Sequence, residues 1–136
     1  MKRILAMIFL VVLLASLMVL TVTADAESII MPRYSYIQVI NSRLAIGNLG
    51  MSSCNANSGF SGGASQKLTC ELQRYEGSTW RTIKTWSTTS TSSALISKNY
   101  AVASGYTYRL RTTCYVYNSA GTILEIGICD SNQVTH

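Results

Sequence analysis

Aromatic and basic side chains are the residues of this 136-residue chain whose types and spacing could bind a ligand. In the segment 79–87, Trp80 and Trp86 are six positions apart, so in a regular strand they lie on one face with Lys84, while Ile83 faces the core. Flat aromatic rings beside cations can stack on sugar rings or on bases. The alternative interpretation is structural: one tryptophan belongs to the core and the other covers a sheet edge. The candidate ligand-binding residues are Trp80, Lys84, Trp86, Arg109, Arg111, Tyr115 and Tyr117.

Catalytic chemistry lacks its usual groups in this sequence. The single histidine, His136, is the last residue, where chain ends fray, so a Ser-His-Asp or Cys-His arrangement would depend on a poorly fixed ring. Glu71 is expected on the outer face of a strand and Glu76 in a turn, which places no pair of carboxylates in one site. There is no calcium loop and no glycine-rich phosphate loop. We therefore predict no catalytic residues, no cofactor and no enzymatic activity.

The N-terminal segment of the chain predicts export. Lys2 and Arg3 precede an apolar run over residues 4–20, and Ala24-Asp25-Ala26 has the small residues of a cleavage site. This layout predicts a signal peptide over residues 1–26 and a single secreted domain over 27–136. An uncleaved N-terminal anchor is the alternative, and no membrane span is expected in the mature chain. The net charge of +5 is too small to make nucleic acid a good partner.

The cysteines Cys54, Cys70, Cys114 and Cys129 all follow the predicted cleavage site. An even number of cysteines in a short exported chain predicts two disulfides, and three connectivities are open. We expect at least one bond among Cys54, Cys70 and Cys114. The spacing contains no C-x-x-C pair and no nearby histidine, so we predict no metal site.

Apolar residues alternate with polar ones along much of the chain after residue 27, which indicates strands. In 106–116 the even positions are mostly apolar, while the odd positions carry Arg109 and Arg111. We expect further strands at 34–40, 43–51, 67–75, 79–87 and 94–103, and a polar loop at 87–93. Seven or eight short strands predict an all-β fold, a single antiparallel β-sandwich.

The last hairpin has a specific predicted register. The turn after Asn118 suits a three-residue loop with Gly121 in the left-handed conformation, which pairs Asn118 with Thr122. Continuing this register places Leu124, Ile126 and Ile128 on the inner face of the final strand.

The segment "VASGYTYRLR" resembles the tyrosine corner of immunoglobulin-like and fibronectin type III domains. The resemblance implies that the hydroxyl of Tyr106 or Tyr108 bonds back to the preceding chain. It also implies a disulfide between Cys54 and Cys114, which have an immunoglobulin-like separation, and that pairing leaves Cys70 with Cys129.

Two longer segments, "ELQRYEGSTWRTIKTWS" and "YAVASGYTYRLRTTCYVYNSAGTILE", resemble small secreted proteins of Gram-positive, clostridia-type bacteria, a family of unknown function. The likeness covers roughly residues 43–126. Its most specific parts are Leu72-Gln73-Arg74, the pair Trp80 and Trp86, and Tyr108-Arg109. It implies export and a β-sandwich, and it implies no particular activity.

Two functions from different classes follow from these observations. The first is a secreted, non-enzymatic binding module that recognises an extracellular glycan, a cell-wall polymer or a protein. The second is a small cationic effector with bacteriocin-like action, which would need an amphipathic or strongly basic segment. The basic residues are singly spaced along the chain, which favours the binding module.

Overall fold

The computed structural model describes residues 33–136, which form strands and connecting turns without a helix. The predicted signal peptide, residues 1–26, lies outside the described residues. The strands are β1 (Ile37–Ile46), β2 (Met51–Phe60), β3 (Ser65–Glu76), β4 (Thr79–Ser90), β5 (Ala94–Ala101), β6 (Thr107–Tyr117), β7 (Ile123–Asp130) and β8 (Val134–Thr135). No helix in this part of the chain is long and apolar enough to cross a membrane.

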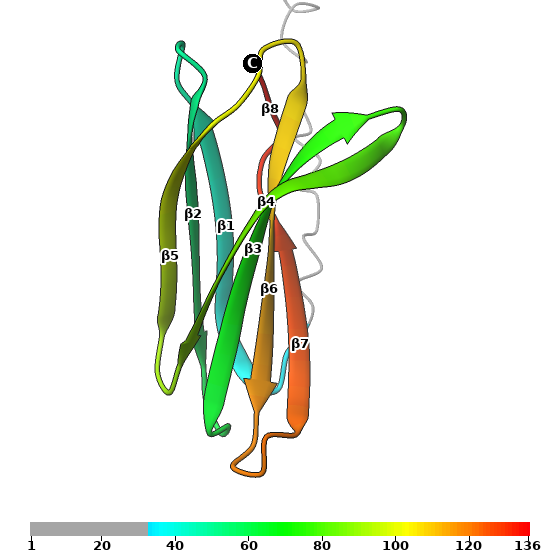
Figure 1. Cartoon of the computed structure of the whole chain (residues 1–136). Helices are drawn as coiled ribbons and strands as arrows, with labels where there is room; N and C mark the ends of the chain where they lie inside the picture. Colours follow the sequence, from blue (N-terminus) through cyan, green and yellow to red (C-terminus); the bar gives the residue numbers. More distant parts are fainter. Residues whose placement is uncertain (1–32) are drawn as a thin grey trace, which may run out of the picture. The chain divides into compact units, whose positions relative to one another are not determined.

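The strands form two antiparallel sheets (Figure 1). One sheet has the order β1-β2-β5, and the other has the order β4-β3-β6-β7, with β8 also paired to β6. Along β2 and β6, buried side chains alternate with partly exposed ones. The buried side chains of the two sheets together form one hydrophobic core. The prediction of an all-β, antiparallel fold is confirmed, and the shared core fits a β-sandwich. Leu110, the predicted core residue of β6, is fully buried.

Strand β7 departs from the predicted register. Asn118 N–H does bond to Thr122 O, at 2.9 Å, and Gly121 has φ +78°, as the turn predicted. A bulge then inserts Leu124, so that Val116 pairs with Glu125 instead of Leu124. Because one inserted residue reverses every following side chain, the predicted inward placement of Ile126 and Ile128 is wrong. About half of each isoleucine side chain is exposed.

The N-terminal end of β1 packs against the inner face of β7. A Cβ added at Gly127 would lie 2.6 Å from Cδ1 of Ile37, so a larger residue there would displace the Ile37 side chain. The Glu125 carboxylate accepts hydrogen bonds from the backbone N–H groups of Ser35, Tyr36 and Ile37, at 2.6, 2.8 and 2.7 Å. Burial alone would raise the pKa of Glu125, but these three bonds lower it. The reversed strand therefore anchors the start of β1.

A second bulge reverses strand β4. Leu72 of β3 pairs with Lys84, and Gln73 pairs with Thr82, so Ile83 is the extra residue. Trp86 lies opposite the buried Cys70 and packs against the core, whereas Trp80 lies opposite Tyr75. The interpretation in which the two tryptophans share a face is therefore wrong, and the structural alternative, with one tryptophan packed on the core, holds for Trp86. Ile83 packs against the core as expected. Figure 1 shows the β3–β4 hairpin turning away from the rest of its sheet, as a bulged strand does.

All four cysteines are free thiols in the structure, in place of the two predicted disulfides. Cys54, Cys70 and Cys114 are completely buried, and Cys129 is partly exposed. Burial raises the pKa of all four thiols, and that of Cys70 reaches about 12. Cys114 makes a hydrogen bond to Gln66 Oε1 at 3.2 Å, which joins it to a buried polar group. The expected Cys54–Cys114 bond is therefore not formed in this structure.

The tyrosine corner is present at the start of β6. Tyr108 is fully buried, and its hydroxyl donates to the carbonyl of Ala103 at 2.6 Å. This bond ties the β5–β6 connection to the core. The prediction is therefore confirmed for Tyr108.

Candidate binding groove between the edge strands

The predicted ligand-binding residues divide into three separate regions. Trp80, Arg109 and Arg111 lie together on the outer face of the larger sheet. Tyr115 and Tyr117 lie farther along that face. Lys84 and Trp86 lie at the other face of β4, beside strand β5 of the second sheet. The sequence had placed all of them in one surface. The bulge at Ile83 moves Lys84 and Trp86 to the other face, and distance along β6 separates Tyr115 and Tyr117 from the arginines.

The first region, which we call the outer-face clasp, comprises Trp80, Gln73, Arg109, Arg111 and Asp130. The Arg109 guanidinium stacks on Trp80, with its carbon 4.3 Å from the ring centroid. Arg109 also donates to Gln73 Oε1 at 2.9 Å and to Asp130 Oδ2 at 3.1 Å. Arg111 donates to both oxygens of Asp130, each at 2.8 Å. The face of Trp80 and the charges of both arginines are thus engaged within the protein.

The ion pairs of the outer-face clasp shift the pKa values of its members. The hydrogen bond from Arg111 lowers the pKa of Asp130, and the charges of Arg109 and Arg111 add to this effect, while burial opposes it. The bond to Asp130 raises the pKa of Arg111 in turn. One carboxylate shared by two guanidinium groups is a stable arrangement, and it leaves little for a ligand to bind.

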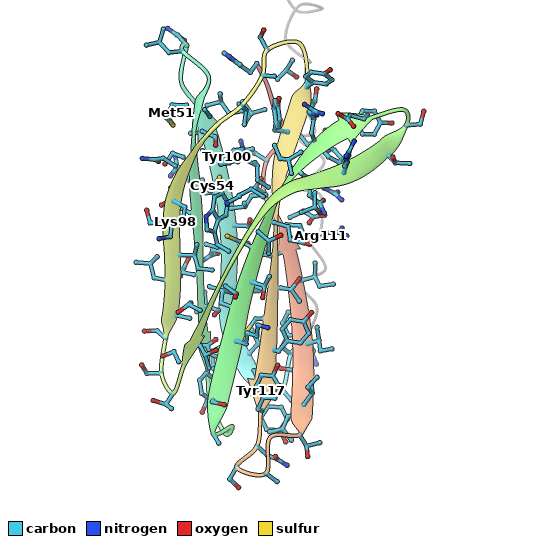
Figure 2. All side chains as sticks on the ribbon, in the orientation of Figure 1. Met51, Cys54, Lys98, Tyr100, Arg111 and Tyr117 are labelled. Atoms are coloured by element: carbon cyan, nitrogen blue, oxygen red, sulfur yellow. The ribbon has the colours of Figure 1, made fainter. Side chains whose placement is uncertain are left out.

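The second region contains Tyr115 and Tyr117 and no tryptophan. Tyr115 pairs across the sheet with Ile126 and with Lys67, and Tyr117 pairs with Ile123. Figure 2 shows Tyr117 near the end of β6, well separated from Tyr100. The exposed isoleucines of β7 make this region more apolar than the sequence predicted.

The third region is a groove between β4 and β5, the edge strands of the two sheets, which lie side by side (Figure 1). We call it the edge-strand groove. It has a volume of about 570 Å³, and residues 86–88 of β4 and residues 95–98 of β5 line it. The lining combines the Trp86 ring, the exposed Leu95, several hydroxyl groups and the Lys98 side chain. Aromatic, hydroxyl and cationic groups therefore meet along one depression.

Tyr100 extends this site next to Trp86. The two rings meet edge to face, with centroids 6.2 Å apart and an interplanar angle of 76°. Lys84 Nζ lies 5.9 Å from the centroid of the Tyr100 ring. Figure 2 shows Tyr100 and Lys98 on the β5 side of the molecule and Arg111 on the side of β7.

Sequence reasoning missed Tyr100 and Lys98. A signal was present, because Ala94, Ile96, Lys98 and Tyr100 occupy alternate positions of one strand, and the first two are buried. The adjacency of β4 and β5 had no local signal, because these strands belong to different sheets.

The groove is cationic because carboxylates are absent from the strands that form it. No Asp or Glu occurs between Glu76 and Glu125 in the sequence. Within residues 33–136, Glu76 and Asp130 pair with arginines, Glu125 binds backbone N–H groups, and Glu71 of β3 accepts a hydrogen bond from the Thr82 hydroxyl. Neither Lys84 nor Lys98 forms an ion pair with any carboxylate of this part of the chain.

The groove offers side chains that can bind a ligand. Lys98 is the one charged side chain in its lining, with Lys84 beside Tyr100, and within residues 33–136 no cluster of His, Cys, Asp or Glu could hold a metal ion. An aromatic face with hydroxyls and cations can stack on a ring and bond to its substituents. Comparisons with protein-family models, with curated proteins and with solved structures found no match to this chain. The site must therefore be interpreted from its own chemistry.

Proposed function

We propose that the protein is a secreted, non-enzymatic module that binds a glycan or a cell-wall polymer in the edge-strand groove. The observation that carries this proposal is the pair of Trp86 and Tyr100 beside a groove lined with hydroxyl groups. Sugars offer apolar ring faces and many hydroxyls, and this combination matches such a lining. Export rests on the signal-peptide pattern of residues 1–26.

The proposal includes an immunoglobulin-like or fibronectin-like β-sandwich. Two observations support it: the first, second and fifth strands share one sheet while the third, sixth and seventh share the other, and Tyr108 forms the tyrosine corner. Domains of this architecture often present binding surfaces on a rigid pair of sheets. The resemblance to secreted proteins of clostridia-type bacteria agrees with this proposal and adds no activity to it.

Affinity electrophoresis through gels containing soluble polysaccharides, with pull-down on insoluble cell-wall material, tests the function. We expect at least one polysaccharide to retard the protein. Tyr100→Ala should weaken that binding about tenfold, the scale of one aromatic stacking contact. Tyr75→Ala is the matched control, because Tyr75 is an exposed aromatic residue that stacks with Trp80 at 5.1 Å on the other face.

Denaturation curves of both variants separate loss of binding from loss of folding. If no polysaccharide or cell-wall preparation retards the protein, the proposed function is wrong. If growth inhibition accompanies that negative result, the effector alternative replaces it.

A further inference from the structure

Lys98 lines the edge-strand groove and Lys84 lies beside Tyr100, next to it. Both lysines occupy positions that face the interior of the fold. Lys98 pairs with the buried Cys54 and follows Ala94 and Ile96 on the inner side of β5. Lys84 pairs with the buried Leu72 on β4. Both lysines are nevertheless exposed, because β4 and β5 are edge strands. Their aliphatic stems can therefore lie along the core while their ammonium groups emerge where the two sheets meet.

These ammonium groups differ from the neighbouring cations in having no counter-charge. Arg74, Arg81, Arg109 and Arg111 each contact Glu76 or Asp130. Among the described residues, no carboxylate contacts Lys84 or Lys98. Two unneutralised charges beside a low-dielectric surface create a positive potential that attracts anions.

The positions of the lysines also restrict the class of ligand. A lysine on an edge strand disfavours the addition of another strand, so an extended peptide paired to β4 or β5 is a poor occupant. Nucleic acid needs many phosphate contacts for useful affinity, and the groove offers two cations. A sugar polymer needs only a ring that stacks on Trp86 or Tyr100 and an acidic substituent within reach of a lysine.

We propose that the edge-strand groove selects anionic glycans, in which a carboxylate or phosphate group on the sugar chain meets Lys84 or Lys98 while a sugar ring contacts Trp86 and Tyr100. This inference rests on the proposed function and specifies the charge of its ligand. A glycan carboxylate and a glycan phosphate are the two sources of this negative charge, and they can be distinguished by binding.

Titration of the purified protein with a uronic-acid polymer, a sugar-phosphate polymer, a neutral dextran and polyglutamate tests the proposal. At low salt, at least one acidic glycan should bind at least tenfold more tightly than the dextran and than polyglutamate. Lys84→Ala and Lys98→Ala should each weaken that binding about two- to fivefold, the range of an exposed ion pair. In about 1 M salt, where screening reduces the Debye length to roughly 3 Å, the effect of each variant should disappear.

Lys67→Ala is the matched control, because it removes the same charge from an exposed position of β3 whose side chain faces away from the core. This variant should bind as the unmodified protein does. Equal binding of dextran and acidic glycans, with no effect of the groove lysines, would overturn the inference and leave glycan binding intact. Polyglutamate binding as tightly as the acidic glycans would also overturn it, because charge alone would then suffice. An absence of binding to every glycan would instead overturn the proposed function.

Discussion

The outer-face clasp and the edge-strand groove contain similar side chains and use them in opposite ways. Each has a tryptophan, a cation stacked on an aromatic ring and a second cation nearby. In the clasp, Asp130 and Gln73 accept hydrogen bonds from Arg109, and the Arg109 guanidinium covers the Trp80 ring. In the groove, the lysines have no carboxylate partner among the described residues. Composition alone therefore does not identify a binding surface; the availability of its charges does.

The position of the carboxylates explains this difference. Asp130 pairs across the sheet with Arg111, so the last strand brings a carboxylate directly to the arginines. Strands β4 and β5 and the loop between them contain no acidic residue. Every residue in this part of the chain is polar, apolar or basic, so the groove keeps the positive charge of its lysines.

The two tryptophans should differ most in their effect on stability. Trp86→Ala should lower the free energy of unfolding by about 2–4 kcal/mol, because it removes a large side chain that packs against the core. Trp80→Ala should lower it by about 1 kcal/mol, the scale of a cation–π contact near the surface. Urea denaturation of both variants measures the difference. Equal losses would contradict the opposite placement of the two rings.

Removing the carboxylate of the clasp should have a smaller effect that depends on pH. Asp130→Asn should lower the free energy of unfolding by about 1 kcal/mol at pH 7, since Arg109 and Arg111 lose their shared partner. The pKa of Asp130 is lower in the folded state, so its stabilisation is present above the unfolded value of about 3.9 and is lost as the pH falls below it.

Denaturation of the variant and of the unmodified protein at neutral and acidic pH measures this loss. The difference between them should shrink toward zero in acid. Lys98→Ala is the control from the groove, where no ion pair with a described carboxylate exists to be lost, and its effect on stability should be the same at both pH values. A difference for Asp130→Asn that persists in acid would mean that its carboxylate charge is not what holds the clasp.

The smallest expected effect is spectroscopic. In Trp80→Phe the remaining tryptophan is Trp86, and its fluorescence should change when the best-binding polysaccharide is added, because the ligand contacts the groove. In Trp86→Phe the remaining ring is Trp80, beneath Arg109, and its emission should stay constant. A response from Trp80 alone would move the binding surface to the outer-face clasp.

Much of the fold was predictable because burial alternates locally along a strand. The alternation in residues 106–116 correctly placed Leu110 inside and Arg109 and Arg111 outside. The glycine turn before β7 and the tyrosine corner were also predictable, since each depends on residues close together in the chain. These features depend on period and on local backbone geometry, and both are written in the sequence.

The candidate site depended on tertiary structure at two points. The bulges at Ile83 and Leu124 each insert one residue, and a period-two pattern gives no sign of an insertion while it reverses all the side chains beyond it. The groove depends on the contact of β4 with β5 across two sheets, which only the packing of a shared core establishes. The sequence by itself determined the all-β class, most strands from residue 67 onward and the scarcity of acidic residues, but the predicted strands 34–40 and 43–51 are one strand, β1, and β2 was not predicted. The tertiary structure alone decided which aromatic rings face each other and which cations are left without a counter-charge, because both are set by contacts between distant segments.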